Sequence, residues 1–82
     1  MTATALQQDT TWLRISNYQV AALNHKLTDR LPELADALNS GLAAFPDMSR
    51  DSFYDVELPN GWAYIHVRDD KQTVYLVAFS RN

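Results

Sequence analysis

The chain lacks cysteine, has only two glycines and contains no long apolar run, and each of these gaps excludes a class of function. Without cysteine there is no disulfide, thiolate metal site or cysteine nucleophile, which fits a reducing compartment. Gly41 and Gly61 alone cannot build a glycine-rich phosphate loop. No stretch approaches the roughly 20 apolar residues of a membrane span, and residues 1–8 lack the features of a secretory signal. We therefore expect a cytoplasmic protein.

Positive charge is also scarce. Seven Lys and Arg residues stand against ten Asp and Glu residues, the net charge is −3, and the basic residues form no cluster in the sequence. Because nucleic-acid binding draws most of its affinity from phosphate neutralisation, this balance argues against nucleic acid as a partner. His25 and His66 are far apart and have no matching acidic ligand set. We expect neither a metal nor a cofactor.

The residues that are present predict a small globular protein. The hydrophobic fraction is 46%, and a chain of 82 residues is long enough for one domain. We expect residues 1–10 to be a flexible N-terminus and residues 11–82 to form a single α+β domain. Residues 11–16 are compatible with either a short extra strand or the lead-in to a helix.

Two helices are predicted in the first half of the domain. Ser16 and Gln19 form a capping box, and the stripe of Val20, Leu23 and Leu27 predicts a first helix ending near Leu27. A second helix is predicted from apolar residues recurring at helical spacing, namely Leu31, Leu34, Ala35, Leu38, Leu42 and Phe45. Proline follows at position 46 and prevents the helix from continuing.

The last thirty residues change to a period of two. Asn60-Gly61 between two alternating runs predicts a tight hairpin with a type I′ turn, and residues 69–72 predict a looser second turn. The expected strands are 53–58, 62–68 and 73–80, with the middle one central. The predicted fold class is therefore α+β, with a two-helix hairpin packed on a three-stranded antiparallel β-meander.

The predicted register places an aliphatic set on one face of this sheet, where the helices should cover it. This set is Tyr54, Val56, Leu58, Ala63, Ile65, Val67, Val74, Leu76 and Ala78. The opposite face should be polar but carries large aromatic residues. We predict that it is a partner-binding surface formed by Phe53, Asp55, Glu57, Trp62, Tyr64, His66, Tyr75, Val77 and Phe79.

Three explanations of this aromatic face remain open. The N-terminal segment with Trp12, Leu13 and Ile15 can fold across it. Two copies can associate as a homodimer, since two-fold dimers are the commonest oligomers and the strand 73–80 is an apolar edge in the simple meander. Another protein can bind there, because aromatic residues are enriched at interfaces. Stacking of single-stranded bases would need a cationic surround, which Asp55 and Glu57 oppose.

One predicted cross-strand row, Asp55–His66–Tyr75, has the residue types for acid–base chemistry. A carboxylate beside an imidazole orients the ring, and a general base can be built in this way. No serine or cysteine occupies a predicted neighbouring position, although Ser52 and Ser80 lie at strand ends. A cross-strand pair that only stabilises the sheet is the simpler interpretation.

Two segments resemble known families. The order of two helices and three strands, with the ending Val67 to Leu76 (VRDDKQTVYL), is similar to bacterial toxins of the RelE/ParE type, which are usually basic. The segment from Leu34 to Tyr54 resembles the helix before the first strand of mono-ADP-ribosyltransferases. Their arginine after the tyrosine is replaced here by Asp55, and no Glu-x-Glu follows. We transfer no site residue from either family.

The sequence therefore predicts a small non-enzymatic protein-interaction module, such as a regulator, an inhibitor or an immunity-type binder. It would use the aromatic face for self-association or for binding a partner, and its acidity suits a basic partner. The alternative is a small enzyme or toxin-like domain that uses His66 with Asp55.

Overall fold

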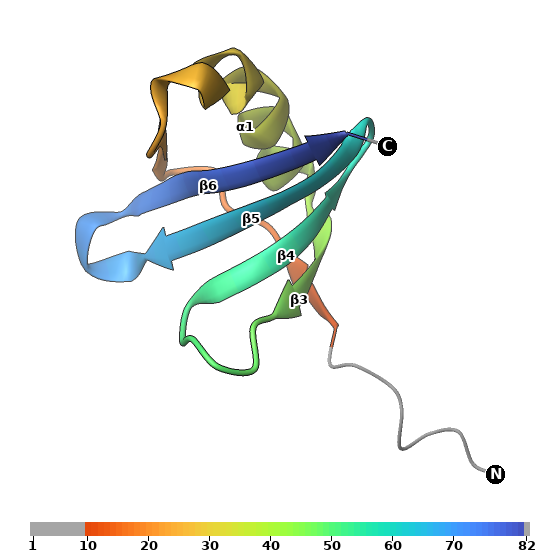
Figure 1. Cartoon of the computed structure of the whole chain (residues 1–82). Coiled ribbons are helices and arrows are strands. Elements are labelled where there is room, and N and C mark those ends of the chain that lie inside the picture. The colour runs from red at the N-terminus through yellow and green to blue at the C-terminus, as the bar shows by residue number, and fades with distance from the viewer. Residues whose placement is uncertain (1–9, 82) are drawn as a thin grey trace, which may run out of the picture.

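A six-stranded mixed sheet, covered on one side by helical segments, is the framework of the computed structural model, which describes residues 10–81 (Figure 1). The strands are β1 (Thr11–Leu13), β2 (Gln19–Ala22), β3 (Leu42–Pro46), β4 (Phe53–Leu58), β5 (Gly61–Arg68) and β6 (Thr73–Arg81), and the sheet order is β1-β3-β4-β5-β6-β2. The helical segments are the 3-10 helices η2 (His25–Arg30) and η3 (Asp69–Lys71) and the α-helix α1 (Leu31–Ser40). The predicted two-helix hairpin on a three-stranded meander is therefore wrong. The expectation of a flexible segment at 1–10 falls almost wholly outside the described residues.

The segment predicted as the first helix forms a strand and a 3-10 helix instead. Val20 pairs with Val74 and Ala22 with Leu76 in a parallel ladder, so two apolar side chains of β2 point toward the core. The chain then turns at Asn24, whose Oδ1 accepts a hydrogen bond from the Lys26 N–H at the start of η2. A stripe of three apolar residues was too short to distinguish a marginal helix from a strand that gains ladder hydrogen bonds.

The second predicted helix is present but ends earlier than the apolar stripe suggested. Leu34 and Leu38 of α1 are fully buried, as its helical spacing requires. Gly41 ends the helix with a φ of 99° and ψ of 141°, a conformation that only glycine adopts readily. Leu42 therefore begins β3 rather than extending the helix, and its alternation with Ala44 buries both against the sheet core.

The first hairpin lies where it was predicted, but its turn is different. Leu58 pairs with Gly61, so the loop is Pro59-Asn60, and neither residue has the positive φ that a type I′ turn demands. Gly61 is a strand residue in close contact with β6, because a Cβ there would lie 2.1 Å from the Ser80 carbonyl oxygen. The register differs from the prediction by two residues, and an even shift keeps each side chain on its expected face.

The second hairpin contains an irregularity that sequence periodicity did not indicate. Val67 pairs with Val74 and Ile65 with Leu76, as predicted, with Gln72 in the left-handed conformation at the turn. Between these pairs and Ala63–Phe79 the register shifts by one residue, which leaves an extra residue at Val77. This bulge moves Phe79 to the helix-covered face and Ala78 to the opposite face.

The core lies between α1 and the aliphatic face of the sheet. It is built from leucine, valine, isoleucine and alanine side chains, with Thr73 as the buried polar residue among those described. Its buried members are Leu34, Leu38, Leu42, Ala44, Val56, Leu58, Ala63, Ile65, Val67, Val74 and Leu76. Removal of their apolar area from water, at about 25 cal/mol per Å², stabilises the fold.

Residues 14–18 form a strap that crosses the helix-covered face from one edge of the sheet to the other. The Ile15 N–H donates to the Leu38 carbonyl at 2.9 Å, and the Tyr18 hydroxyl donates to the Asp69 carboxylate at 2.7 Å, which raises the pKa of Tyr18. The strap connects β1, paired with β3, to β2, paired with β6. Strand β6 is therefore not an edge strand, contrary to the prediction.

Candidate functional site: the outer sheet face

The face of the sheet opposite α1 carries most of the aromatic residues that the sequence predicted there, as the strand register shows. Alternation places Phe53, Asp55 and Glu57 of β4 and Trp62, Tyr64 and His66 of β5 on this outer face, with Tyr75 of β6 beside them. Among residues 10–81, no helix lies against this face. Residues 11–15 do not fold across it either, because β1 is an edge strand and Ile15 belongs to the strap; Trp12, opposite Ala43 in the ladder, only extends this face at its edge.

At one end of the outer face, aromatic rings form a stacked row. The centroids of His66 and Phe53 are 4.0 Å apart at an interplanar angle of 12°, and those of His66 and Tyr75 are 6.4 Å apart at 23°. The Arg50 guanidinium lies 4.2 Å from the Phe53 ring centroid on top of this row. Each aromatic pair contributes about 0.5–1.5 kcal/mol beyond its buried area, so this end of the face is well supported.

The loop at residues 47–52 anchors itself on this stacked row. The Asp47 carboxylate accepts a hydrogen bond from the Tyr64 hydroxyl and further hydrogen bonds from the Ser49 N–H at 2.9 Å and hydroxyl at 3.0 Å. These bonds, that from Tyr64 above all, lower the pKa of Asp47, and the same carboxylate raises the pKa of Tyr64. The loop therefore leaves Phe53 and Tyr64 half-buried, whereas Asp55, Glu57 and Trp62 toward the other end of the face are more exposed.

The other end of the outer face combines exposed rings with exposed carboxylates. Trp62 packs against Phe45 of β3 with ring centroids 5.6 Å apart and keeps 38% of its surface exposed. Asp55 and Glu57 are exposed beside it, and Glu57 is directly opposite Trp62 in the ladder. A depression of about 230 Å³ lies between Trp62 and Tyr64 and includes Asp55 in its lining. Its volume is below the ~300–1,000 Å³ of sites for small molecules, so it suits a single inserted side chain.

The predicted row of Asp55, His66 and Tyr75 does not form. Asp55 pairs with Tyr64, whereas His66 pairs with Phe53 on one side and with Tyr75 on the other. The polar contact of the imidazole is between His66 Nδ1 and the Ser52 carbonyl oxygen at 3.2 Å. The two-residue difference in register places Asp55 and His66 in different rows. The hypothesis that His66 acts as a general base with Asp55 therefore loses its geometric basis.

Two residues predicted on the partner-binding face occupy other positions because of the bulge. Phe79 packs against the core, and the Arg30 guanidinium lies 5.0 Å from its ring centroid on the helix-covered side. Val77 is the extra residue at the bulge and is half-buried. In the observed ladder Trp62 pairs with Ser80, and Tyr64 pairs with Ala78 on its β6 side.

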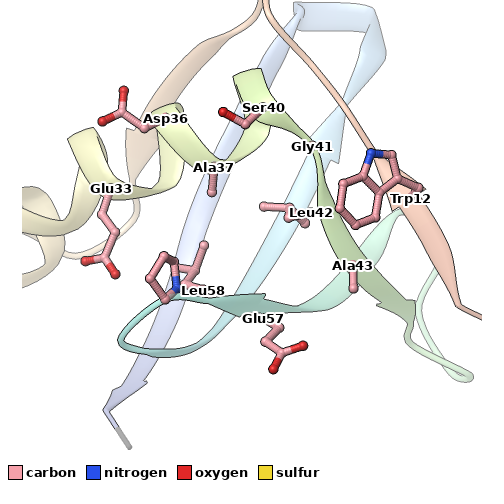
Figure 2. A pocket seen from close by; sticks show the side chains of 11 residues that line it. Trp12, Glu33, Asp36, Ala37, Ser40, Gly41, Leu42, Ala43, Glu57 and Leu58 are labelled. Atoms are coloured by element: carbon pink, nitrogen blue, oxygen red, sulfur yellow. The ribbon is translucent and has the colours of Figure 1, made fainter.

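A groove of about 660 Å³ adjoins the exposed end of the face, between α1 and the first residues of β3 (Figure 2). Its lining consists of Trp12, Glu33, Asp36, Ala37, Ser40, Gly41, Leu42, Ala43, Glu57, Leu58 and Pro59. The sequence prediction did not include this groove, because Trp12, Glu33 and Glu57 are brought together only by the pairing of β1 with β3 and of β3 with β4. The one available signal was Trp12, an apolar residue in a polar segment.

No group of three or more His, Asp or Glu side chains in residues 10–81 is arranged to hold a metal ion. Within the same residues, no helix has the length and apolarity to cross a membrane.

Comparisons of the chain with protein-family models, with curated proteins and with solved structures gave no match. The element order that the resemblance to RelE/ParE toxins requires is not the observed one. Function must therefore be argued from the surface itself.

Proposed function

We propose that this protein is a small, non-enzymatic interaction module of the cytoplasm, such as a regulator or inhibitor, that binds another protein through the exposed end of its outer sheet face. The observation that carries the proposal is the partly exposed Trp62, packed on Phe45 and bordered by Asp55 and Glu57. Tryptophan is among the residues that most often dominate binding energy at protein interfaces. A fixed ring on a sheet also loses little conformational entropy on binding.

The design of the surface supports binding rather than catalysis. The carboxylates and the imidazole occupy different rows of the ladder, so the acid–base pair that the enzymatic alternative needs is missing from the outer face. The loop at 47–52 fixes the stacked row at one end and leaves the ring and carboxylates exposed at the other. An exposed patch supported from one side in this way is typical of a docking surface.

Substitution of Trp62 tests this proposal. Partners captured from the native host by the tagged wild-type protein are compared with those captured by Trp62→Ser and by Lys26→Ser, a control in η2 on the helix-covered side. We expect Trp62→Ser to lose a partner that Lys26→Ser retains, while circular dichroism shows both variants folded. Equal capture by both variants would contradict the proposal.

Self-association is the competing use of the same surface. Sedimentation of the wild type over a range of concentrations separates the two uses, since a dimer that dissociates in Trp62→Ser would make a second copy the occupant. We expect a monomer, because the carboxylates of two stacked faces would be buried together.

A further inference from the structure

The carboxylates around Trp62, like those of Asp36 and Asp51, have no hydrogen-bond or ion-pair partner within residues 10–81, whereas four other acidic groups do. Asp47, Asp69 and Asp70 each accept a hydrogen bond from a side chain, and Asp29 lies 3.8 Å from Arg30. Within residues 10–81, Asp55 and Glu57 make no hydrogen bond or ion pair. They lie on the exposed end of the outer face, whereas the Arg50 guanidinium lies over Phe53 at the other end.

Glu57 also connects this face with the neighbouring groove. It lies opposite Trp62 in the ladder and at the same time lines the groove together with Glu33 and Trp12. No lysine, arginine or histidine lines the groove or the depression beside Trp62. Figure 2 shows Glu33 extending from α1 toward Leu58, on the other side of β4 from Glu57. Acidic groups therefore continue from the outer face into the groove without a compensating cation.

Glu33 supplies a second, independent observation. Its Oε2 atom is shielded from solvent and has no hydrogen-bond partner within the described chain. A shielded carboxylate oxygen without a partner is unfavourable, and the cost is removed when a cation reaches it. Lysine and arginine are the side chains long enough to supply that cation from a bound segment.

The two tryptophans provide matching surfaces for such side chains. Trp12 is 68% exposed at the groove and Trp62 is 38% exposed on the outer face. The face of an indole ring is the best side-chain surface for a cation, and a guanidinium can stack on it. Trp62 lines the depression together with the unpaired Asp55, and Trp12 lines the groove at the end opposite Glu33, as Figure 2 shows.

We propose that the surface from Glu33 across Glu57 to Trp62 binds an extended segment of the partner protein that carries lysine or arginine residues. This inference rests on the proposed function and adds the chemistry of the partner. One cationic side chain enters the groove toward Glu33, and another enters the depression between Trp62 and Tyr64, where Asp55 receives it. The carboxylates repel nucleic acid from the same surface.

Titration with short peptides tests the charge requirement. Capped decalysine and decaarginine, with decaglutamate as the charge-reversed control, are added to the full chain at physiological ionic strength while tryptophan emission is recorded. We expect both basic peptides to bind and decaglutamate to have no effect. Asp55→Asn/Glu57→Gln should weaken binding by about three- to thirtyfold, and Glu33→Gln should weaken it in the same direction.

The matched control is Asp29→Asn/Asp51→Asn, which removes the same net charge at two exposed residues that line neither the groove nor the depression. Its affinity should remain within about twofold of the wild type. Equal weakening by both double variants would mean a general charge effect and would overturn the inference, as would failure of both basic peptides to bind. A third result is that capture of the native partner depends on Trp62 but not on Asp55 and Glu57. That result would overturn the inference that the bound segment is basic and would leave the proposed function intact.

Discussion

Replacement of Gly41 by alanine should disturb the fold and the groove together. The φ of 99° at Gly41 is one that residues with a side chain rarely adopt, and forcing it costs about 1–3 kcal/mol. An alanine Cβ would also lie 2.3 Å from Nε1 and 2.7 Å from Cε2 of the Trp12 indole. The indole therefore has to leave its position on the start of β3.

The cost of moving the indole can be worked out from its exposure. With 68% of Trp12 exposed, about a third of a side chain that can bury ~250 Å² is in contact with the protein, or ~80 Å². At about 25 cal/mol per Å², this contact stabilises the fold by at most about 2 kcal/mol. Gly41→Ala should therefore destabilise the protein by about 1–5 kcal/mol, and by about 1–3 kcal/mol when Trp12 is already alanine.

A double-mutant cycle measures this difference. Urea unfolding of the wild type, Gly41→Ala, Trp12→Ala and the double variant is followed by far-ultraviolet circular dichroism, which does not depend on the tryptophans. The expected coupling between the two positions is up to about 2 kcal/mol. A Gly41→Ala cost below about 1 kcal/mol would refute the backbone argument, and identical costs in both backgrounds would refute the placement of the indole on Gly41.

Three further outcomes are expected. Leu38→Ala should lower the free energy of unfolding by about 2–5 kcal/mol in urea titrations, because the side chain is fully buried, and a loss below ~1 kcal/mol would contradict its core position. The folded-state pKa of Asp47 is lowered from 3.8, so its hydrogen bonds stabilise the fold above that pH, and this stability is lost as the pH falls through the folded pKa. Tyr64→Phe should therefore lose less free energy of unfolding on acidification than the wild type. Parallel plots of the free energy of unfolding against pH for the two proteins would contradict this. Gly61→Ala should destabilise the β5–β6 pairing and lower the melting temperature, since its Cβ would meet the Ser80 carbonyl oxygen, and an unchanged melting temperature would contradict that close approach.

The C-terminal half of the fold was predictable because its signals are local. Alternation over 53–58, 62–68 and 73–80 and the turns between these runs located β4, β5 and β6 to within about a residue. The faces also remained as predicted over most of their length, because an error of two residues in register leaves side chains on the same side. Only the extra residue at Val77 reversed a prediction, and it moved Phe79 away from the outer face.

The N-terminal half was not predictable because its structure depends on distant partners. β1 and β2 are strands of three and four residues that pair with β3 and β6, and nothing near them in the sequence indicates those partners. The same applies to the groove, since Trp12, Glu33 and Glu57 converge through long-range strand pairing. Part of the candidate site, Asp55, Glu57 and Trp62, was nevertheless found from alternation alone.

The strap at residues 14–18 has a consequence for how the chain reaches its native state. β2 cannot pair until β6 is in place, and β6 is the last strand of the sheet in sequence, more than fifty positions away. The ladder between them therefore forms late and at a high cost in chain entropy. Until then the free edge of β6 can pair with other chains. A cut within residues 14–18 is thus expected to turn a well-behaved domain into one that aggregates, although Glu33, Asp55, Glu57 and Trp62 have not been altered.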